Sequence, residues 1–252
     1  MKLVDTHCHL DNEKFNEDRE ELIEKIENEL EFCVNIGYDL ESSKKTVGYT
    51  KKYKKIYGAI GIHPVDITGY SDELEKELEE LAKNEKIVAI GEIGLDYHWM
   101  TEPKDVQKDG FRRQINLAEK LNLPIVVHSR DAMEDTIEIL KEFPNIKGII
   151  HCYPGSTESA EILIKNFYLG IGGTLTFKNS KKLVNVVKNI PLERLVIETD
   201  CPYLTPEPFR GKRNEPLYVK YVAEKIAEIK EISIEEVIEV TTENARKVYG
   251  IR

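Results

Sequence analysis

The strongest constraint on the fold of this chain is an alternation of two kinds of segment along most of its length. Short runs of β-branched and apolar residues alternate with longer amphipathic, charged stretches. The strand-like runs lie at residues 3–9, 32–37, 56–62, 87–91, 125–128, 148–151, 168–172 and 195–199. Because a parallel strand pair needs a long crossover connection, this alternation predicts parallel strands joined by helices.

The intervening stretches carry helical patterns. They lie at residues 18–30, 72–83, 106–121, 132–143, 156–166 and 180–189, with two further helices expected at 217–230 and 234–249. In the first, Leu22, Ile23, Ile26 and Leu30 recur at helical spacing and form one apolar stripe. Eight strand–helix units in 252 residues fit a closed α/β barrel, the (β/α)8 TIM barrel, which typically needs about 250 residues. No linker or repeat interrupts the pattern, so we expect a single domain over residues 1–252.

Composition excludes several classes of protein. The net charge of −10 argues against non-specific attraction to nucleic acid, unless a bound cation changes the charge locally. No apolar run approaches the roughly 18 residues of a membrane span, so we expect no membrane association. The chain has 4 scattered Cys and no signal peptide is recognised, which predicts a reduced, cytoplasmic protein.

Metal-capable side chains gather at the carboxyl ends of the predicted strands, where the active sites of TIM barrels lie. The residues at these ends are His7, His9, His63, Glu92, His128, His151 and Asp200. In an extended strand His7 and His9 project to the same face, while Cys8 points the opposite way. Four of the histidines and two carboxylates exceed the needs of one tetrahedral ion, and two divalent ions fit the count better.

Each of these residues also has a plainer interpretation. His7 and His9 could be polar residues at a barrel mouth, and Glu92 could be a solvated loop residue between glycines. We prefer a bridging ligand for Glu92 because of its place after an apolar strand. Asp200 could be both a ligand and the base that accepts a proton from a metal-activated water. His63 could contact substrate or stabilise a turn, and Arg130 is a candidate for binding a phosphate.

Several motifs together resemble the TatD family of metal-dependent hydrolases. They are DTHCHLD at 5–11, GIHP at 61–64, GEIGLDY at 91–97, VHSR at 127–130, HCY at 151–153 and IETDCPYL at 197–204, followed by Arg210 to Asn214 and by Asn244. They occur in order, and their joint occurrence is far more specific than any one of them.

The resemblance implies an amidohydrolase-like TIM barrel with a dinuclear metal site and TatD-type deoxyribonuclease activity, often that of an exonuclease. It implies that one metal is held by His7, His9 and Asp200 and the second by His128 and His151. Glu92 would bridge the two, and Glu92 and Asp200 would be the catalytic residues. His63 and Arg130 would lie on the substrate side. The two divalent ions could be Zn²⁺, Mn²⁺, Mg²⁺, Ni²⁺ or Co²⁺, of which Mg²⁺ usually prefers more oxygen ligands.

Two alternatives to a nuclease remain open from the sequence. The same barrel and metals could hydrolyse a small ester, lactone or amide. A non-catalytic barrel that binds a partner is also conceivable, but it would leave buried carboxylates poorly compensated. The sequence does not specify the physiological metal, the direction of exonuclease action, whether DNA or another phosphodiester is the substrate, or the oligomeric state.

Overall fold

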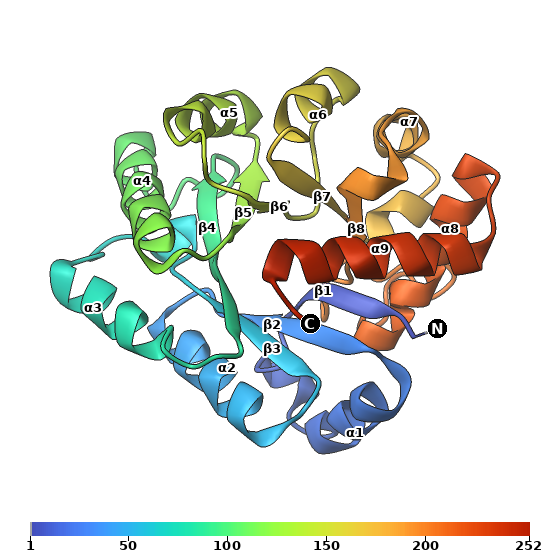
Figure 1. The fold of residues 1–252 in the computed structure, drawn as a ribbon, viewed down its shortest axis with the longest axis horizontal. Coiled ribbons are helices and arrows are strands. Elements are labelled where there is room, and N and C mark those ends of the chain that lie inside the picture. Colours follow the sequence, from blue (N-terminus) through green and yellow to red (C-terminus); the bar gives the residue numbers. More distant parts are fainter. Residues whose placement is uncertain (1) are drawn as a thin grey trace.

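The computed structural model describes residues 2–252 and shows one sheet of eight parallel strands in the order β1 to β8. The strands are β1 (Val4–Cys8), β2 (Phe32–Ile36), β3 (Ile56–Ile60), β4 (Ile87–Asp96), β5 (Ile125–Arg130), β6 (Gly148–Ile150), β7 (Phe167–Ile171) and β8 (Leu195–Ile197). Helices surround the sheet as a layer (Figure 1). The fold is therefore the TIM barrel that the strand–helix alternation predicted.

At least one α-helix lies between each pair of successive strands, and two α-helices follow β8. The α-helices are α1 (Arg19–Glu29), α2 (Leu40–Lys52), α3 (Asp72–Leu81), α4 (Lys104–Leu121), α5 (Met133–Glu142), α6 (Thr157–Leu163), α7 (Lys181–Asn189), α8 (Val219–Lys230) and α9 (Ile234–Tyr249). None of the helices within residues 2–252 combines the length and apolarity that a bilayer span requires.

The barrel closes between β1 and β8 through a short but well-bonded seam. Cys8 pairs with Cys201 in an isolated parallel bridge, and the Asp200 backbone N–H donates to the His7 carbonyl at 2.9 Å. The buried Asp5 carboxyl accepts from the Thr199 N–H at 2.9 Å and from its hydroxyl at 2.5 Å. Burial, partly opposed by these hydrogen bonds, raises the pKa of Asp5 to about 8. The seam thus fixes His7 next to Asp200.

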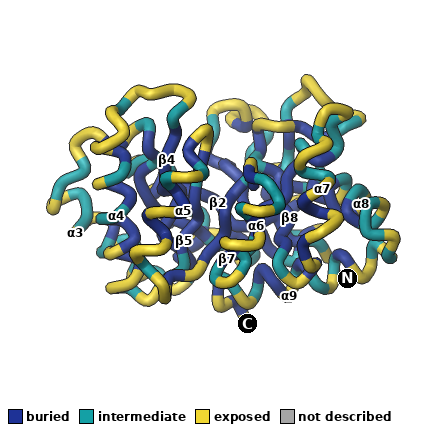
Figure 2. The backbone as a smooth tube through the Cα atoms, turned by 90° about the horizontal axis from the view of Figure 1, so that it is seen from above, coloured by how far each residue is buried: buried dark blue, intermediate teal, exposed yellow. Residues whose placement is uncertain are grey.

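The strand residues form two apolar layers. The larger cluster joins strand residues such as Cys8 and Ile60 to the surrounding helices. The smaller one joins Val4, Val34 and other strand residues to Ala245 and Tyr249 of α9. The α9 helix lies across the barrel in Figure 1, and Figure 2 shows the strands as buried segments at the centre of the molecule. Since α9 packs on residues such as Val4 at the start of β1, it leaves the carboxyl end of the barrel uncovered. The loops that follow the strands lie at that carboxyl end.

Two details differ from the sequence prediction. The fourth strand does not end at Gly91 but continues to Asp96, with a shift of register between Ile90 and Ile93. Glu92 therefore lies within a buried strand rather than in a loop after it. The helical patterns identified in the sequence also omitted α2, in which Leu40 is the one large aliphatic residue besides Val47.

Candidate metal centre

The predicted metal-capable side chains converge at the carboxyl end of the barrel. The histidines of the HxH motif behave as the strand geometry predicted. The His7 Nε2 and His9 Nε2 atoms lie 3.2 Å apart, whereas Cys8 is buried in the larger apolar cluster. Asp200 follows β8 with a φ of +57°, a backbone region that Asp tolerates better than most residues.

His7, His9, Glu92 and Asp200 form a compact group of donor atoms. The Glu92 Oε2 atom lies 3.5 Å from His7 Nε2 and 3.9 Å from His9 Nε2. The Asp200 Oδ1 atom lies 3.8 Å from His7 Nε2 and 3.4 Å from His9 Nε2. Ligand atoms held 2.0–2.2 Å from one tetrahedral ion are about 3.3–3.6 Å apart. The spacing of this group therefore fits a single divalent cation.

The other oxygen of Glu92 faces a different set of imidazoles. Glu92 Oε1 lies 2.8 Å from His128 Nδ1, 3.8 Å from His63 Nε2 and 3.9 Å from His151 Nε2. His63 also contacts the His128 ring edge to face, with 4.4 Å between the ring centroids. Each oxygen of one buried carboxylate thus faces its own group of imidazole nitrogens, as a ligand between two cations would.

Carboxylates and a carbonyl contact the outer nitrogens of three of these histidines. His9 Nδ1–H donates to the Ile36 carbonyl at 3.0 Å. His128 Nε2 lies 3.0 Å from Asp96 Oδ2, and His151 Nδ1 lies 2.9 Å from Glu198 Oε1. A partner on one ring nitrogen leaves the other as the lone-pair donor, which fixes the orientation of a metal-ligating histidine.

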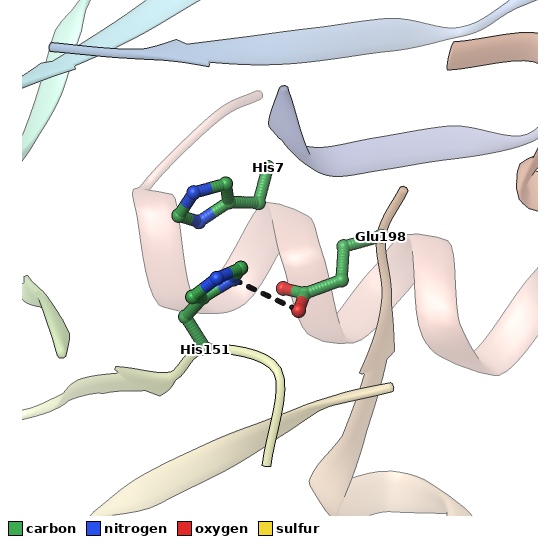
Figure 3. Close-up of side chains that lie close together, drawn as sticks. All are labelled: His7, His151 and Glu198. Atoms are coloured by element: carbon green, nitrogen blue, oxygen red, sulfur yellow. Dashed lines mark ion pairs between the residues drawn. The ribbon is translucent and has the colours of Figure 1, made fainter. Parts of the chain in front are cut away.

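Glu198 lies beside two stacked imidazoles. The rings of His7 and His151 stack with 3.5 Å between their centroids, and the Glu198 carboxylate approaches them from the side (Figure 3). Its Oε1 atom contacts His151 and also accepts the Cys152 N–H at 2.6 Å. Its Oε2 atom and His7 Nδ1 are both buried without a hydrogen-bond partner. Gly170 makes room for the carboxylate, because a Cβ there would lie 2.4 Å from Glu198 Oε2.

Imidazoles alone compensate the two central carboxylates. Within residues 2–252, no Lys or Arg forms an ion pair with Glu92 or Asp200. Burial opposes a charge on Glu92, but the imidazoles of His151 and His128 outweigh it and hold the pKa of Glu92 well below its usual range. Burial likewise opposes a charge on His151, yet the carboxylates of Glu198 and Glu92 raise its pKa to about 10. The carboxylates at this site therefore stabilise positive charge on neighbouring groups.

The predicted substrate-side residues occupy different places. His63 lies beside Glu92 and His128, and burial together with the neighbouring His128 lowers its pKa to about 3. Arg130 ends β5 at the exposed rim, where its guanidinium carbon lies 5.5 Å from the centre of the Trp99 ring. Of the cations after β8, Arg213 is engaged by Asp18 through two contacts of 2.6 Å. Arg213 therefore fixes this loop to the start of α1.

Asp96 and Glu198 were not assigned a role from the sequence. Asp96 follows Glu92 by four residues, so the two share a face if the strand is extended through both. Glu198 follows β8 directly and precedes Asp200 by two residues, a spacing that would place both on one face of an extended segment. A search for acidic residues at even spacing from the predicted ligands would have found both.

The chain is similar in sequence and in structure to metal-dependent hydrolases of one family. A model of the family described as TatD related DNase matches residues 4–250. The chain is 53% identical over 253 residues to the uncharacterized metal-dependent hydrolase YabD of Bacillus subtilis, covering 99% of each. Among solved structures it resembles the TatD homolog YJJV of Escherichia coli, with a TM-score of 0.92, 26% identity and 99% and 98% of the two chains covered. A TatD family hydrolase of Entamoeba histolytica has a TM-score of 0.88 at 28% identity, again over 99% and 98% of the chains.

Proposed function

The chain belongs to the TatD related DNase family, and from this premise we propose that it is a divalent-metal-dependent phosphodiesterase that hydrolyses DNA as an exonuclease. The observation that carries the proposal is the placement of Glu92, whose two oxygens face two separate groups of imidazoles. Such an arrangement suits two cations that share one carboxylate. Two-cation sites are a common solution for phosphodiester hydrolysis.

We assign the donor groups to two cations. His7, His9 and Asp200 would hold the first, and His128 and His151 would hold the second, with Glu92 between them. His63 lies near enough to Glu92 and His128 to complete the second group. When bound, divalent cations lower the pKa of a coordinated water and neutralise charge on phosphoryl oxygens.

The protein residues supply the positioning and the proton acceptor. The side chains of Asp200 and His128 are 15% and 18% exposed, whereas those of His7 and Glu92 are only 1% and 5% exposed. A phosphodiester therefore approaches from the side of Asp200 and His128. We assign to Asp200 the role of accepting the proton of the attacking water, because its carboxylate is more exposed to solvent than that of Glu92. Arg130 at the rim would contact a flanking phosphate.

The proposal is tested with end-labelled oligonucleotides, assayed separately with Zn²⁺, Mn²⁺, Mg²⁺, Ni²⁺ and Co²⁺. We expect stepwise release of nucleotides with at least one of these ions. Asp200→Asn should lose most of this activity, because the amide neither carries the charge nor accepts the proton. A panel of small esters, lactones and amides is assayed in parallel. Turnover of that panel without any cleavage of DNA would contradict the proposal.

Asp96 should act as a positioning residue for His128. Asp96→Asn keeps an oxygen for the backbone N–H groups of His98 and Trp99 but removes the charge facing His128 Nε2. We expect the affinity for the second cation to fall by roughly 10–100-fold, as measured by competition with a chelating dye. Asp131→Asn is the matched control, since Asp131 is exposed and its carboxylate lies 3.4 Å from His98 Nδ1 rather than beside a candidate ligand. Equal metal affinities for Asp96→Asn and the wild type would show that Asp96 does not position His128.

A further inference from the structure

Large apolar side chains are exposed mainly around the mouth of the barrel. Trp99 is 63% exposed and Tyr203 is 46% exposed, and each is followed by another exposed apolar residue, Met100 and Leu204. The first pair follows β4 and the second follows β8. Since β4 and β8 are four strands apart in an eight-stranded barrel, the two loops lie on opposite sides of the candidate metal centre.

The Trp99 loop is hydrogen-bonded to the metal centre. The Asp96 Oδ1 atom accepts the backbone N–H groups of His98 at 2.9 Å and of Trp99 at 3.0 Å. The Oδ2 atom of the same carboxylate lies 3.0 Å from His128 Nε2. One carboxylate therefore fixes the position of Trp99 relative to His128.

Tyr203 is attached in a comparable way on the other side of the metal centre. The Tyr203 backbone N–H donates to the Asp200 carbonyl at 2.9 Å, and the Tyr203 hydroxyl accepts from the Asn12 side-chain amide at 3.0 Å. The ring centroid lies 6.3 Å from that of His9. The Trp99 backbone and the Tyr203 side chain are thus both hydrogen-bonded beside the metal centre, while both rings stay exposed.

Each ring is accompanied by a cation. The Arg130 guanidinium lies 5.5 Å from the Trp99 ring centre, and the Lys14 ammonium lies 5.1 Å from the Tyr203 ring centre. Among the residues that the structure describes, neither cation forms an ion pair with a carboxylate, in a chain of net charge −10. An aromatic face beside an uncommitted cation suits a nucleotide, whose base stacks on the ring and whose phosphate attracts the cation.

We propose that Trp99 and Tyr203 form two nucleobase-stacking subsites, one on each side of the metal centre. The ligand is a strand with unpaired bases that crosses the mouth of the barrel, so that one phosphodiester lies over the metal centre between stacked bases. The proposal rests on the proposed phosphodiesterase function. It adds that recognition depends on base faces as well as on the backbone, because stacking requires a base that is not already stacked in a duplex.

The fluorescence of Trp99 tests the first subsite without any need for turnover. The chain contains 1 Trp, so its emission reports on this ring alone. The probe is a thymidine hexamer with phosphorothioate linkages, added to the zinc-loaded wild type, and the comparison is an abasic strand of the same length and linkage. We expect saturable quenching by the thymidine strand and little by the abasic strand. Equal responses to both strands, or no response to either, would overturn the Trp99 subsite.

Steady-state kinetics test both subsites with variants that remove the aromatic ring or keep one. Trp99→Ala and Tyr203→Ala should each lower kcat/KM on a thymidine oligonucleotide by roughly 5–150-fold. Neither should change kcat/KM on an abasic strand with ordinary phosphodiester linkages by more than about twofold, whereas Trp99→Phe and Tyr203→Phe should retain most activity on both substrates. Ile162→Ala is the matched control, because Ile162 is 46% exposed on α6. Equal losses on both strands would refute base stacking.

Different results would contradict the phosphodiesterase function and the stacking subsites. If the wild type cleaves neither strand with any metal, the phosphodiesterase function is wrong, and the quenching experiment still decides the Trp99 subsite. If the wild type cleaves both strands equally well and the alanine variants match it, the function stands and the stacking subsites are wrong.

Discussion

Glu92→Gln should lower kcat by about a thousand-fold and reduce the bound metal from the proposed two ions per chain to at most one. The amide has the shape of the carboxylate but lacks its charge, and it offers one oxygen where the carboxylate offers two. Loss of the shared ligand removes several kcal/mol of stabilisation from a two-cation reaction, which corresponds to a rate loss of this size. The measurements are steady-state cleavage of an end-labelled oligonucleotide and elemental analysis of the purified variant.

Glu85→Gln is the matched control, because Glu85 is an exposed residue just before the start of β4. It should match the wild type in both rate and metal content. A Glu92→Gln protein that retains two ions and the wild-type rate would show that Glu92 does not join two cations, and would remove the main support for the proposed function.

Removal of metal by a strong chelator should abolish cleavage of DNA and lower the midpoint of thermal unfolding. A ligand present at 100 times its Kd stabilises the folded state by about 2.7 kcal/mol. For a chain of this size such a change corresponds to roughly 5–11 °C. The measurements are the cleavage rate and the calorimetric midpoint before chelation, after dialysis, and after return of Zn²⁺ or Mn²⁺.

Return of metal should restore both properties in the wild type, and it should restore neither fully in Glu92→Gln. That comparison separates binding at the candidate centre from weak binding to the acidic surface. A chelated wild type that keeps its cleavage rate and its midpoint would contradict a metal-dependent mechanism.

Much of the architecture could be predicted because the signals are local and repeated. Eight short apolar runs separated by amphipathic stretches leave few topologies other than a parallel barrel. The bounds of α9, Ile234–Tyr249, agree with the prediction because Ser233 caps its first turn and Gly250 ends it in a left-handed conformation. The α2 helix was missed because its sequence, LESSKKTVGYTKK, has small and polar residues on its buried face.

The convergence of the site could also be foreseen, because the strand ends of a parallel barrel meet at one rim. The period of two in an extended strand placed His7 and His9 together, as their Nε2 atoms are in the structure. The roles assigned to these residues as metal ligands, and to His63 and Arg130 as substrate contacts, remain predictions.

Even spacing marks Asp96 and Glu198 as candidates, but the histidines that they contact could not be assigned because these histidines are distant in the sequence. The length of β4 was the deciding error for Asp96. Glycines at 91 and 94 suggested a loop, but a Cβ at Gly94 would lie 2.0 Å from the His128 carbonyl oxygen. Gly94 is therefore a site of close approach between β4 and β5 and not a break in the strand. Glu198 contacts a histidine 47 positions earlier, a pairing that only the closed barrel reveals.

Anomalous diffraction from crystals grown with zinc or manganese tests the central claim most directly. We expect two peaks per chain at the carboxyl end of the barrel. One should be contacted by His7, His9 and Asp200, the other by His128 and His151, and both by Glu92. The absence of anomalous peaks among these side chains, or ions bound only elsewhere on the molecule, would contradict that claim.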